Sequence, residues 1–340
     1  MLARVFMTAV ALLAACPSGA RALTVAARGD AVESGIAEAY ARPFTAATDI
    51  SVKMESWDGG LDTLRTRLPE AGWDLVELDA EELNAGCAEG LFEKLDWTAI
   101  GGRDHYTAMG ATDCGVGAAV SNLVLAWDRD KLQAPPTWAD FWDIAKIPGK
   151  RGLGRHVRGA LEFALLADGV APGDVYKVLA SNDGVDRAFR KLDQLKPYIV
   201  WWQTPAEAAK ILGSGDVLMT ATPSRVIAEA NRAEKRNFGV QFAGSLYEPR
   251  SWAIPKGAAN LKEAAQFLYF TGSPAVEARL FRSVGAAGLA KGVNDWLTPE
   301  QLALSPTFPA NAAGAIRVDN GFWHDNLAKL KPRFEAWLGQ

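Results

Sequence analysis

Apolar residues in the first third of the chain repeat at two spacings, one typical of strands and one of helices. Three short apolar runs predict β-strands: residues 23–27, 50–54 and 73–78. Two stretches between them repeat apolar residues at helical spacing: Val32, Ile36 and Tyr40, then Leu61, Leu64 and Leu68. Asp30 precedes the first stretch as a favourable N-cap. Strands that alternate with helices in this order predict a parallel sheet covered by helices.

The same alternation returns in the middle of the chain and predicts a second α/β unit. Its predicted helices and strands are residues 185–192, 198–202, 205–212, 217–222 and 238–243. Pro205 is expected to open the third of these elements and Gly213 to close it. A strand-like stretch at 118–127 leads into the turn-rich segment 134–137, where we expect the chain to cross between units, with a second crossing near 251–255.

The first 22 residues have the pattern of a signal peptide. A basic start is followed by an apolar run at residues 5–15 and by Ala20-Arg21-Ala22, a small-x-small cleavage site. The run is shorter than the roughly 20 residues that a membrane-spanning helix needs. We therefore expect an exported protein in the periplasm. A competing interpretation is a lipobox at Leu13-Ala14-Ala15-Cys16, in which Cys16 would carry a lipid anchor.

Length and charge narrow the class of protein. The 340 residues exceed what one hydrophobic core usually spans, so two domains are expected. The formal net charge of −4 becomes −6 without Arg4 and Arg21, which disfavours a nucleic-acid or anionic-membrane surface. Apart from Cys16, the cysteines are Cys87 and Cys114, and an even pair in an exported protein predicts a disulfide.

The chain carries none of the common catalytic motifs. We find no Gly-x-Ser-x-Gly elbow, no phosphate-binding glycine loop with lysine and no His-Glu-x-x-His helix, and three scattered histidines do not favour a metal site. The pair Glu81-Glu82 is interpreted as a solvated helix face, because adjacent helical residues point apart. We therefore expect no cofactor, no metal and no enzymatic activity, with a secreted hydrolase as the alternative from a different class.

Several segments, in this order and spacing, resemble the spermidine/putrescine-type solute-binding proteins of bacterial ABC importers. They are Trp73-Asp-Leu-Val-Glu-Leu-Asp79, Pro136-Thr-Trp-Ala-Asp-Phe-Trp142, Ser214-Gly-Asp-Val-Leu-Met219, Ser251-Trp-Ala-Ile-Pro-Lys256 and a C-terminal helix with Trp323, Phe334 and Trp337. The resemblance covers nearly the whole mature chain. It implies a type II periplasmic-binding fold: two α/β lobes joined by two crossover hinge segments, with the ligand cleft between them.

The resemblance also implies a division of the chain and a set of partners. After the signal peptide at 1–22, lobe 1 would comprise 23–125 and 252–295, and lobe 2 would comprise 126–251 and 296–340. The ligand would lie at the carboxyl ends of the strands, where open α/β sheets generally bind their ligands. A monomeric carrier of this class would deliver a small solute to an ABC permease and ATPase in the inner membrane.

Arginines stand where polyamine-binding members carry aromatic or acidic residues. Arg28 follows the first strand, Arg155 and Arg158 replace an acidic pair, and Arg250 occupies the position of a ligand-binding Asp. The Trp expected after residues 217–220 is replaced by a small residue, Ala221 or Thr222, with Arg225 just beyond. Guanidinium groups bind carboxylate, sulfonate or phosphonate oxygens through paired hydrogen bonds and repel ammonium groups. The pattern predicts an anionic or zwitterionic organic solute.

The remaining candidates for ligand contact are two acids and two tryptophans, each with a structural alternative. Asp30 and Asp79 could hold an amine, although Asp30 is first an N-cap. Trp57 could stack on the ligand or pack in the core, and Trp252 could line the site or pack at a hinge. For Arg28 and Arg250 the alternative is an interlobe ion pair, and for Arg155 and Arg158 a solvated turn. A genuine polyamine ligand, held by acids placed elsewhere, stays an open alternative.

Overall fold

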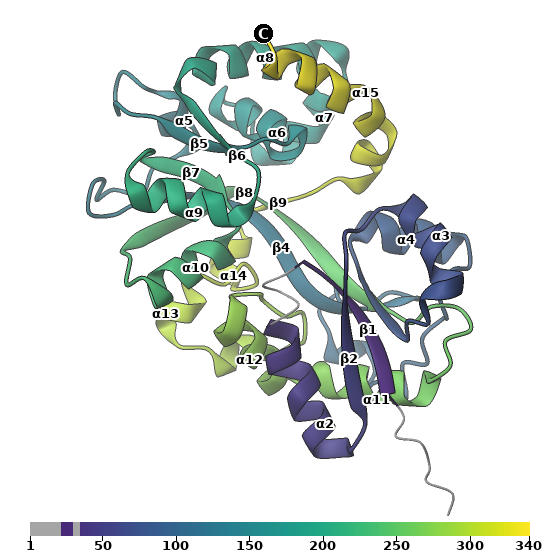
Figure 1. The fold of residues 1–340 in the computed structure, drawn as a ribbon. Coiled ribbons are helices and arrows are strands. Elements are labelled where there is room, and N and C mark those ends of the chain that lie inside the picture. Colours follow the sequence, from purple (N-terminus) through teal and green to yellow (C-terminus); the bar gives the residue numbers. More distant parts are fainter. Residues whose placement is uncertain (1–21, 30–34) are drawn as a thin grey trace, which may run out of the picture.

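Nine strands form one sheet in the part of the chain that the computed structural model describes, residues 22–29 and 35–340 (Figure 1). Their order is β2-β1-β3-β8-β4-β7-β5-β6, with β9 beside β8. The strands are β1 (Ala22–Arg28), β2 (Ser51–Trp57), β3 (Leu75–Leu78), β4 (Gly115–Asp128), β5 (Arg151–Gly154), β6 (Ile199–Trp202), β7 (Met219–Thr222), β8 (Phe238–Ala253) and β9 (Ile316–Arg317). The predicted signal peptide, except Ala22, and Asp30 lie outside the described residues.

Lobe 1 is built on β1 with β2 and β3 as its parallel neighbours, as the alternating pattern predicts. Its other elements are η1 (Ala37–Ala41), α2 (Arg42–Thr48), α3 (Leu61–Ala71), α4 (Ala80–Ala88), η2 (Arg103–His105), α11 (Leu261–Thr271) and α12 (Pro274–Val284). Apolar residues of β1, η1 and α11 pack in one cluster, and those of β3, α3 and α4 pack in another. The helices therefore cover both faces of this end of the sheet.

Lobe 2 is built on β5 with β6 and β7 as its parallel neighbours. Its helices are α5 (Trp138–Trp142), α6 (Val157–Ala167), η3 (Pro172–Asp174), α7 (Val175–Leu179), α8 (Asn182–Leu195), η4 (Lys196–Tyr198), α9 (Pro205–Ser214), α10 (Ser224–Ala233) and α15 (Asn320–Leu338). The connection from α12 to β9 holds η5 (Val293–Trp296), α13 (Pro299–Leu302) and α14 (Pro309–Ala312). The helix predicted at 205–212 runs on past Gly213 and ends at Gly215, which adopts the left-handed conformation that suits a C-cap.

Two long antiparallel strands, β4 and β8, connect the lobes (Figure 1). At one end β8 pairs with β3, and at the other end β4 pairs with β7. The predicted crossing at 134–137 is therefore wrong, because the chain crosses within β4 and reaches lobe 2 before that turn. The predicted strand 238–243 likewise does not end at Gly244 but continues through the second crossing to Ala253. The register of the pair shifts between Gly117 and Ala119 and between Leu123 and Leu125.

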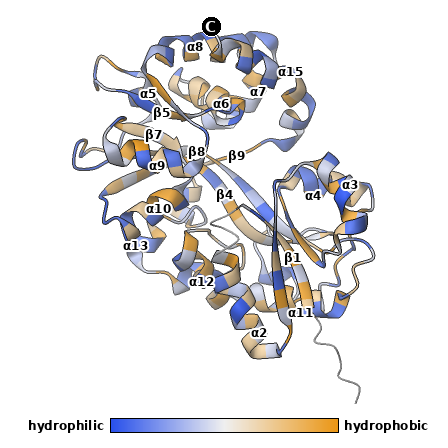
Figure 2. Ribbon diagram, in the orientation of Figure 1, coloured by the Kyte–Doolittle hydropathy of each residue, from blue (hydrophilic) through white to orange (hydrophobic). Residues whose placement is uncertain are grey.

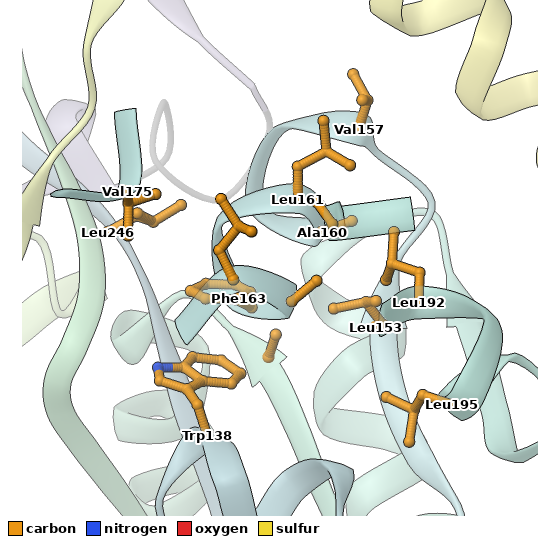
Figure 3. Packing of buried hydrophobic residues seen from close by; sticks show 14 of the residues in the cluster. Trp138, Leu153, Val157, Ala160, Leu161, Phe163, Val175, Leu192, Leu195 and Leu246 are labelled. Carbon is orange, nitrogen blue, oxygen red and sulfur yellow. The ribbon is translucent and has the colours of Figure 1, made fainter. Parts of the chain in front are cut away.

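Separate hydrophobic clusters fill the two lobes. Figure 3 shows part of the lobe 2 core, where the Trp138 and Phe163 rings stack with their centroids 3.8 Å apart beside Leu161, Leu192 and Leu195. The helices around both cores carry apolar and polar residues on different faces (Figure 2). None of the four clusters combines residues of β1–β3 with residues of β5–β7. Each lobe thus has its own core, whereas the predicted residue boundaries of the lobes stay a prediction.

A disulfide joins Cys87 at the end of α4 to Cys114 just before β4, as the cysteine count predicts. Their Cα atoms lie 5.9 Å apart. The bond fastens the helix that follows β3 to the strand that leads into lobe 2. Separately, no helix within the described ranges is long and apolar enough to span a membrane.

Candidate ligand-binding site between the lobes

The carboxyl ends of β1, β2 and β3 form the wall that lobe 1 presents to lobe 2. Because these strands are parallel, their last residues meet at one edge, and the register places Arg28 beside Trp57. The Arg28 guanidinium lies 4.7 Å above the centre of the Trp57 ring. The Trp57 indole is 2% exposed and donates a hydrogen bond to the Glu77 carbonyl. In this structure Trp57 supports Arg28 and offers no free face to a ligand.

Two acids at the start of α4 hold the charge of Arg28. Its guanidinium forms an ion pair with Glu82 and lies 3.5 Å from an Asp79 oxygen. Asp79 and Glu82 also form a capping box, in which each side chain accepts a hydrogen bond from the backbone of the other. Burial raises the pKa of Glu82, the nearby Asp79 charge raises it further, and Arg28 opposes both. The interpretation of Glu81-Glu82 as a solvated face is therefore wrong for Glu82, which is buried.

The turn after β2 makes room for Arg28. Gly59 has a φ of +86°, and a Cβ atom there would lie 2.0 Å from a terminal nitrogen of Arg28. The next residue, Gly60, donates its backbone N–H to Glu82 over 2.6 Å. This turn therefore needs glycine both for its backbone conformation and for the close approach of the guanidinium.

Lobe 2 contributes Thr222 and Arg225 from the end of β7 and the start of α10. Asn122 on β4 fixes this turn, since its carboxamide accepts a hydrogen bond from the Ser224 N–H and donates one to the Ser224 hydroxyl, both over 2.9 Å. Arg225 is half-buried, and within residues 22–29 and 35–340 its guanidinium has no ion-pair partner. Burial lowers the pKa of Arg225 and the nearby Arg250 lowers it further, while Glu77 opposes them.

Strand β8 carries Glu248 and Arg250 between the two walls. Arg250 lies 3.6 Å from a carboxylate oxygen of Glu77 on β3, whose side chain is 1% exposed. Glu248 is mostly buried, and this burial raises its pKa, with Asp79 adding to the effect and Arg158 and Arg250 opposing it. Alternate residues of a strand share a face, so Glu248 and Arg250 point to the same side of β8.

Arg158 connects lobe 2 to both β8 and lobe 1. Its guanidinium lies 3.4 Å from a Glu248 oxygen and 3.7 Å from a Glu81 oxygen on α4. Gly159, with a φ of +92°, starts α6 in a non-helical conformation directly after Arg158. Arg155, in contrast, is exposed. The predicted pair Arg155 and Arg158 therefore divides into one residue at the interlobe site and one that faces solvent.

The interlobe site, as we use the term below, comprises nine charged residues: Arg28, Glu77, Asp79, Glu81, Glu82, Arg158, Arg225, Glu248 and Arg250. Trp252 is not part of it, since its side chain is 1% exposed and packs edge-on against Phe267 in lobe 1. Sequence reasoning missed Glu77, although a glutamate inside an otherwise apolar strand is a signal that it needs a buried partner. It also counted too few acids, because three of the four site arginines are paired.

Three buried polar atoms at this place have no hydrogen-bond partner in the described part of the chain. They are Arg28 Nε, the Thr222 hydroxyl and Glu248 Oε1. Buried polar atoms are nearly always paired, so unpaired ones at one place indicate a missing partner. Donor and acceptor atoms are both among them. No group of acids, histidines and cysteines suited to a metal ion occurs within the described ranges.

Comparison with known proteins places this arrangement in a family. Residues 39–310 match the family model described as bacterial extracellular solute-binding protein. The chain belongs to this family. The match supports the general carrier role that the resemblance implies, but it does not specify the spermidine/putrescine subtype.

Three similar proteins show what members of this kind are described as binding. A gamma-aminobutyric acid (GABA)-binding protein of Pseudomonas aeruginosa is 38% identical over 99% of this chain and 96% of its own. A structure described as a GABA receptor is 26% identical, with a TM-score of 0.80 over 94% of this chain and 98% of that one. A binding protein of A. tumefaciens B6 in complex with glucopine is 25% identical, with a TM-score of 0.78 over 93% and 99%.

A separate hollow of about 650 Å³ lies beside the interlobe site of this solute-binding protein. Its walls come from α4, α7 and the segment before α15, and include Asn84, Tyr176, Lys177 and Asn320. Asn320 also hydrogen-bonds to Glu248. None of the ligand-binding residues predicted from the sequence lines this hollow.

Proposed function

We propose that the chain is the periplasmic carrier of an ABC importer and that its solute is a small zwitterion with a carboxylate at one end and an ammonium group at the other. GABA is the first compound to test. In this proposal residues 1–22 direct export, and the loaded carrier delivers its solute to a membrane permease driven by an ATPase. The family membership supports the carrier role, and the interlobe site supports the class of solute.

The unpaired guanidinium of Arg225 is the observation on which the proposal depends. A half-buried cation next to a second cation, Arg250, is costly unless an anion joins them. A carboxylate between the two would accept paired hydrogen bonds from a guanidinium and neutralise the local excess of positive charge. The Thr222 hydroxyl, buried and unpaired, is a further donor on the same lobe. Each of these features favours a carboxylate at this end of the site.

The acids at the other end of the site suit an ammonium group. Glu248 has one buried oxygen without a partner, and Asp79 is close enough to affect its pKa. Residues two apart in a strand are separated by about 7 Å, so Glu248 and Arg250 present opposite charges at this spacing. An ω-amino acid such as GABA separates its two charges by a chain of methylene groups, whereas an α-amino acid carries them on one carbon. The spacing therefore favours the ω-amino acid.

The relatives support the same class of solute. Both GABA and glucopine contain a carboxylate, and the protein described as binding GABA covers nearly the whole chain at 38% identity. A polyamine remains the alternative. A spermidine/putrescine-binding protein of Streptococcus pneumoniae shares the fold at 18% identity, which carries no argument about the ligand.

A ligand panel on the mature protein tests the proposal. Thermal unfolding is measured with GABA, its shorter and longer homologues, glutamate, glucopine, putrescine and spermidine, and each hit is confirmed by calorimetry. A ligand at 100 times its dissociation constant adds about 2.7 kcal/mol to the free energy of unfolding. Stabilisation by GABA or another carboxylate is the expected result. Stabilisation by putrescine or spermidine alone would overturn the proposal.

A further inference from the structure

Glu81 is a residue of the interlobe site that the proposed solute does not need. It lies on α4, whose neighbour Leu83 packs in a lobe 1 cluster. Both cations that approach its carboxylate come from lobe 2: Arg158 at 3.7 Å from one oxygen and His324 Nδ1 at 3.3 Å from the other. Arg158 precedes α6 residues of the lobe 2 core, and His324 follows the core residue Trp323 on α15. One acid of lobe 1 thus lies against two basic side chains of lobe 2.

Lobe 2 holds Arg158 in place independently of Glu81. The Arg158 guanidinium lies 5.6 Å from the centre of the Trp323 ring, and Glu248 pairs with it on another side. Trp323 is fully buried and donates its indole N–H to Glu162 over 2.9 Å. Glu162 also accepts the Gly159 N–H over 2.8 Å and so fixes the start of α6. The basic side chains that receive Glu81 are therefore arranged before the lobes meet.

We propose that Glu81, with Arg158 and His324, forms a latch that holds the two lobes together without touching the solute. This inference depends on the proposed carrier function, because only a protein that opens and closes needs a latch. Lobe motion about β4 and β8 would separate α4 from α6 and α15, so both contacts of Glu81 exist only when the lobes are closed. The latch shifts the equilibrium of the protein itself toward the closed state.

Such a latch changes affinity in a characteristic way. Apparent affinity is proportional to the fraction of protein that can adopt the binding-competent state, so loss of the latch weakens every ligand by the same factor. A solute leaves only after the lobes open, and the loss therefore raises the dissociation rate. The preference among solutes does not change. A residue in direct contact with the solute would alter that preference.

The test compares Glu81→Gln with Glu89→Gln in the full mature chain. Glu89 lies at the end of the same helix but pairs with Arg65, which belongs to lobe 1, so this variant removes a matched charge without affecting the interlobe contact. We expect Glu81→Gln to raise the dissociation constant for GABA and for a second, weaker carboxylate hit of the panel about threefold to tenfold, by an equal factor for each. The Glu89→Gln variant should bind like the wild type.

A measurement without ligand separates the latch from the proposed solute. Small-angle X-ray scattering of the ligand-free protein should give a larger radius of gyration for Glu81→Gln than for wild type and Glu89→Gln. If GABA fails to bind the wild type, this comparison still tests the latch. Equal radii of gyration together with unchanged dissociation rates would overturn the latch and leave the proposed function intact. A change in the ratio of affinities for two solutes would also overturn it, since Glu81 would then contact the solute.

Discussion

The walls that the two lobes present to each other differ in how they treat charge. On lobe 1, Arg28 lies on Trp57 and is neutralised by Glu82 and Asp79 within the same lobe. On lobe 2, Arg225 follows a short strand and has no ion-pair partner among the described residues. Both arginines come directly after strands at the same kind of position. A guanidinium that is already paired serves the structure, and one that is left unpaired is available to a ligand.

The disulfide belongs only to the paired wall, and its removal should have the largest effect on stability. It closes a loop of 27 residues between Cys87 and Cys114. Replacing both residues with Ser should lower the free energy of unfolding by about 3–4 kcal/mol, because the open chain gains conformational freedom. Urea denaturation of the double variant measures the change.

Wild-type protein under reducing conditions is the control for this substitution. Its stability should fall to that of the double variant, since the same bond is lost without a change of sequence. An unfolding free energy unchanged by either treatment would show that the packing of α4 against β3 already fixes this wall and that the bond adds nothing.

Arg225→Ala should have the largest effect on binding while leaving stability almost unchanged. Each charge-assisted hydrogen bond contributes about 1.5–3 kcal/mol, so the loss of a paired contact should raise the dissociation constant for GABA at least about 100-fold. Arg225→Lys should keep part of the affinity because it restores the charge but not the two parallel bonds. Calorimetric titration measures both variants.

Arg232→Ala is the matched control on the same helix. Its side chain is exposed and already pairs with Glu229, so its removal should leave the affinity at the wild-type value. If Arg225→Ala bound GABA as tightly as this control does, the contrast between paired and unpaired arginines would carry no information about the ligand.

Glu277 offers a smaller effect that sharpens the comparison, since it is an unpaired buried acid inside lobe 1. Its side chain accepts the Ala290 N–H over 2.8 Å, and burial raises its pKa to about 8. The folded state therefore keeps a proton that the unfolded state loses near pH 4.3. Its contribution to stability is complete below that pH and disappears as the pH rises toward 8.

The corresponding measurement is the free energy of unfolding at pH 5 and pH 7 for wild type and Glu277→Gln. Over this interval the wild type should lose about 2 kcal/mol more than the variant, because one pH unit per extra bound proton corresponds to about 1.36 kcal/mol. Parallel curves for the two proteins would mean that Glu277 is ionised when folded. A buried charge without a partner would then be tolerated in lobe 1 as well as in lobe 2.

The sequence predicted those parts of the fold that depend on local spacing. The strands of lobe 1, the parallel pairing of β1 and the positions of Arg28 and Asp79 at strand ends all follow from apolar runs and from the geometry of parallel sheets. The continuous strand β8 was missed, because Gly244 and Pro249 are typical of turns. In the structure Gly244 instead has a φ of +70° and lies against Trp138.

The pairing of charges could not be predicted, since it depends on distances between elements far apart in the chain. Glu77 and Arg250 are 173 positions apart, and Glu81 meets Arg158 only through the arrangement of two lobes. Neither residue of such a pair carries a local signal of its partner. The sequence therefore identified the arginines but not the acids that neutralise them.

Gly59 has a further consequence for the wall of lobe 1. Any side chain at this position would occupy the space of the Arg28 guanidinium, and the flexible arginine would move before the backbone does. Displacement of that guanidinium would leave the buried carboxylate of Glu82 without its cation. A single substitution at a residue with no functional group would thus reverse the charge that this wall offers, from balanced to acidic. Evolution has here a one-step route from a carrier of zwitterions toward a carrier of cations.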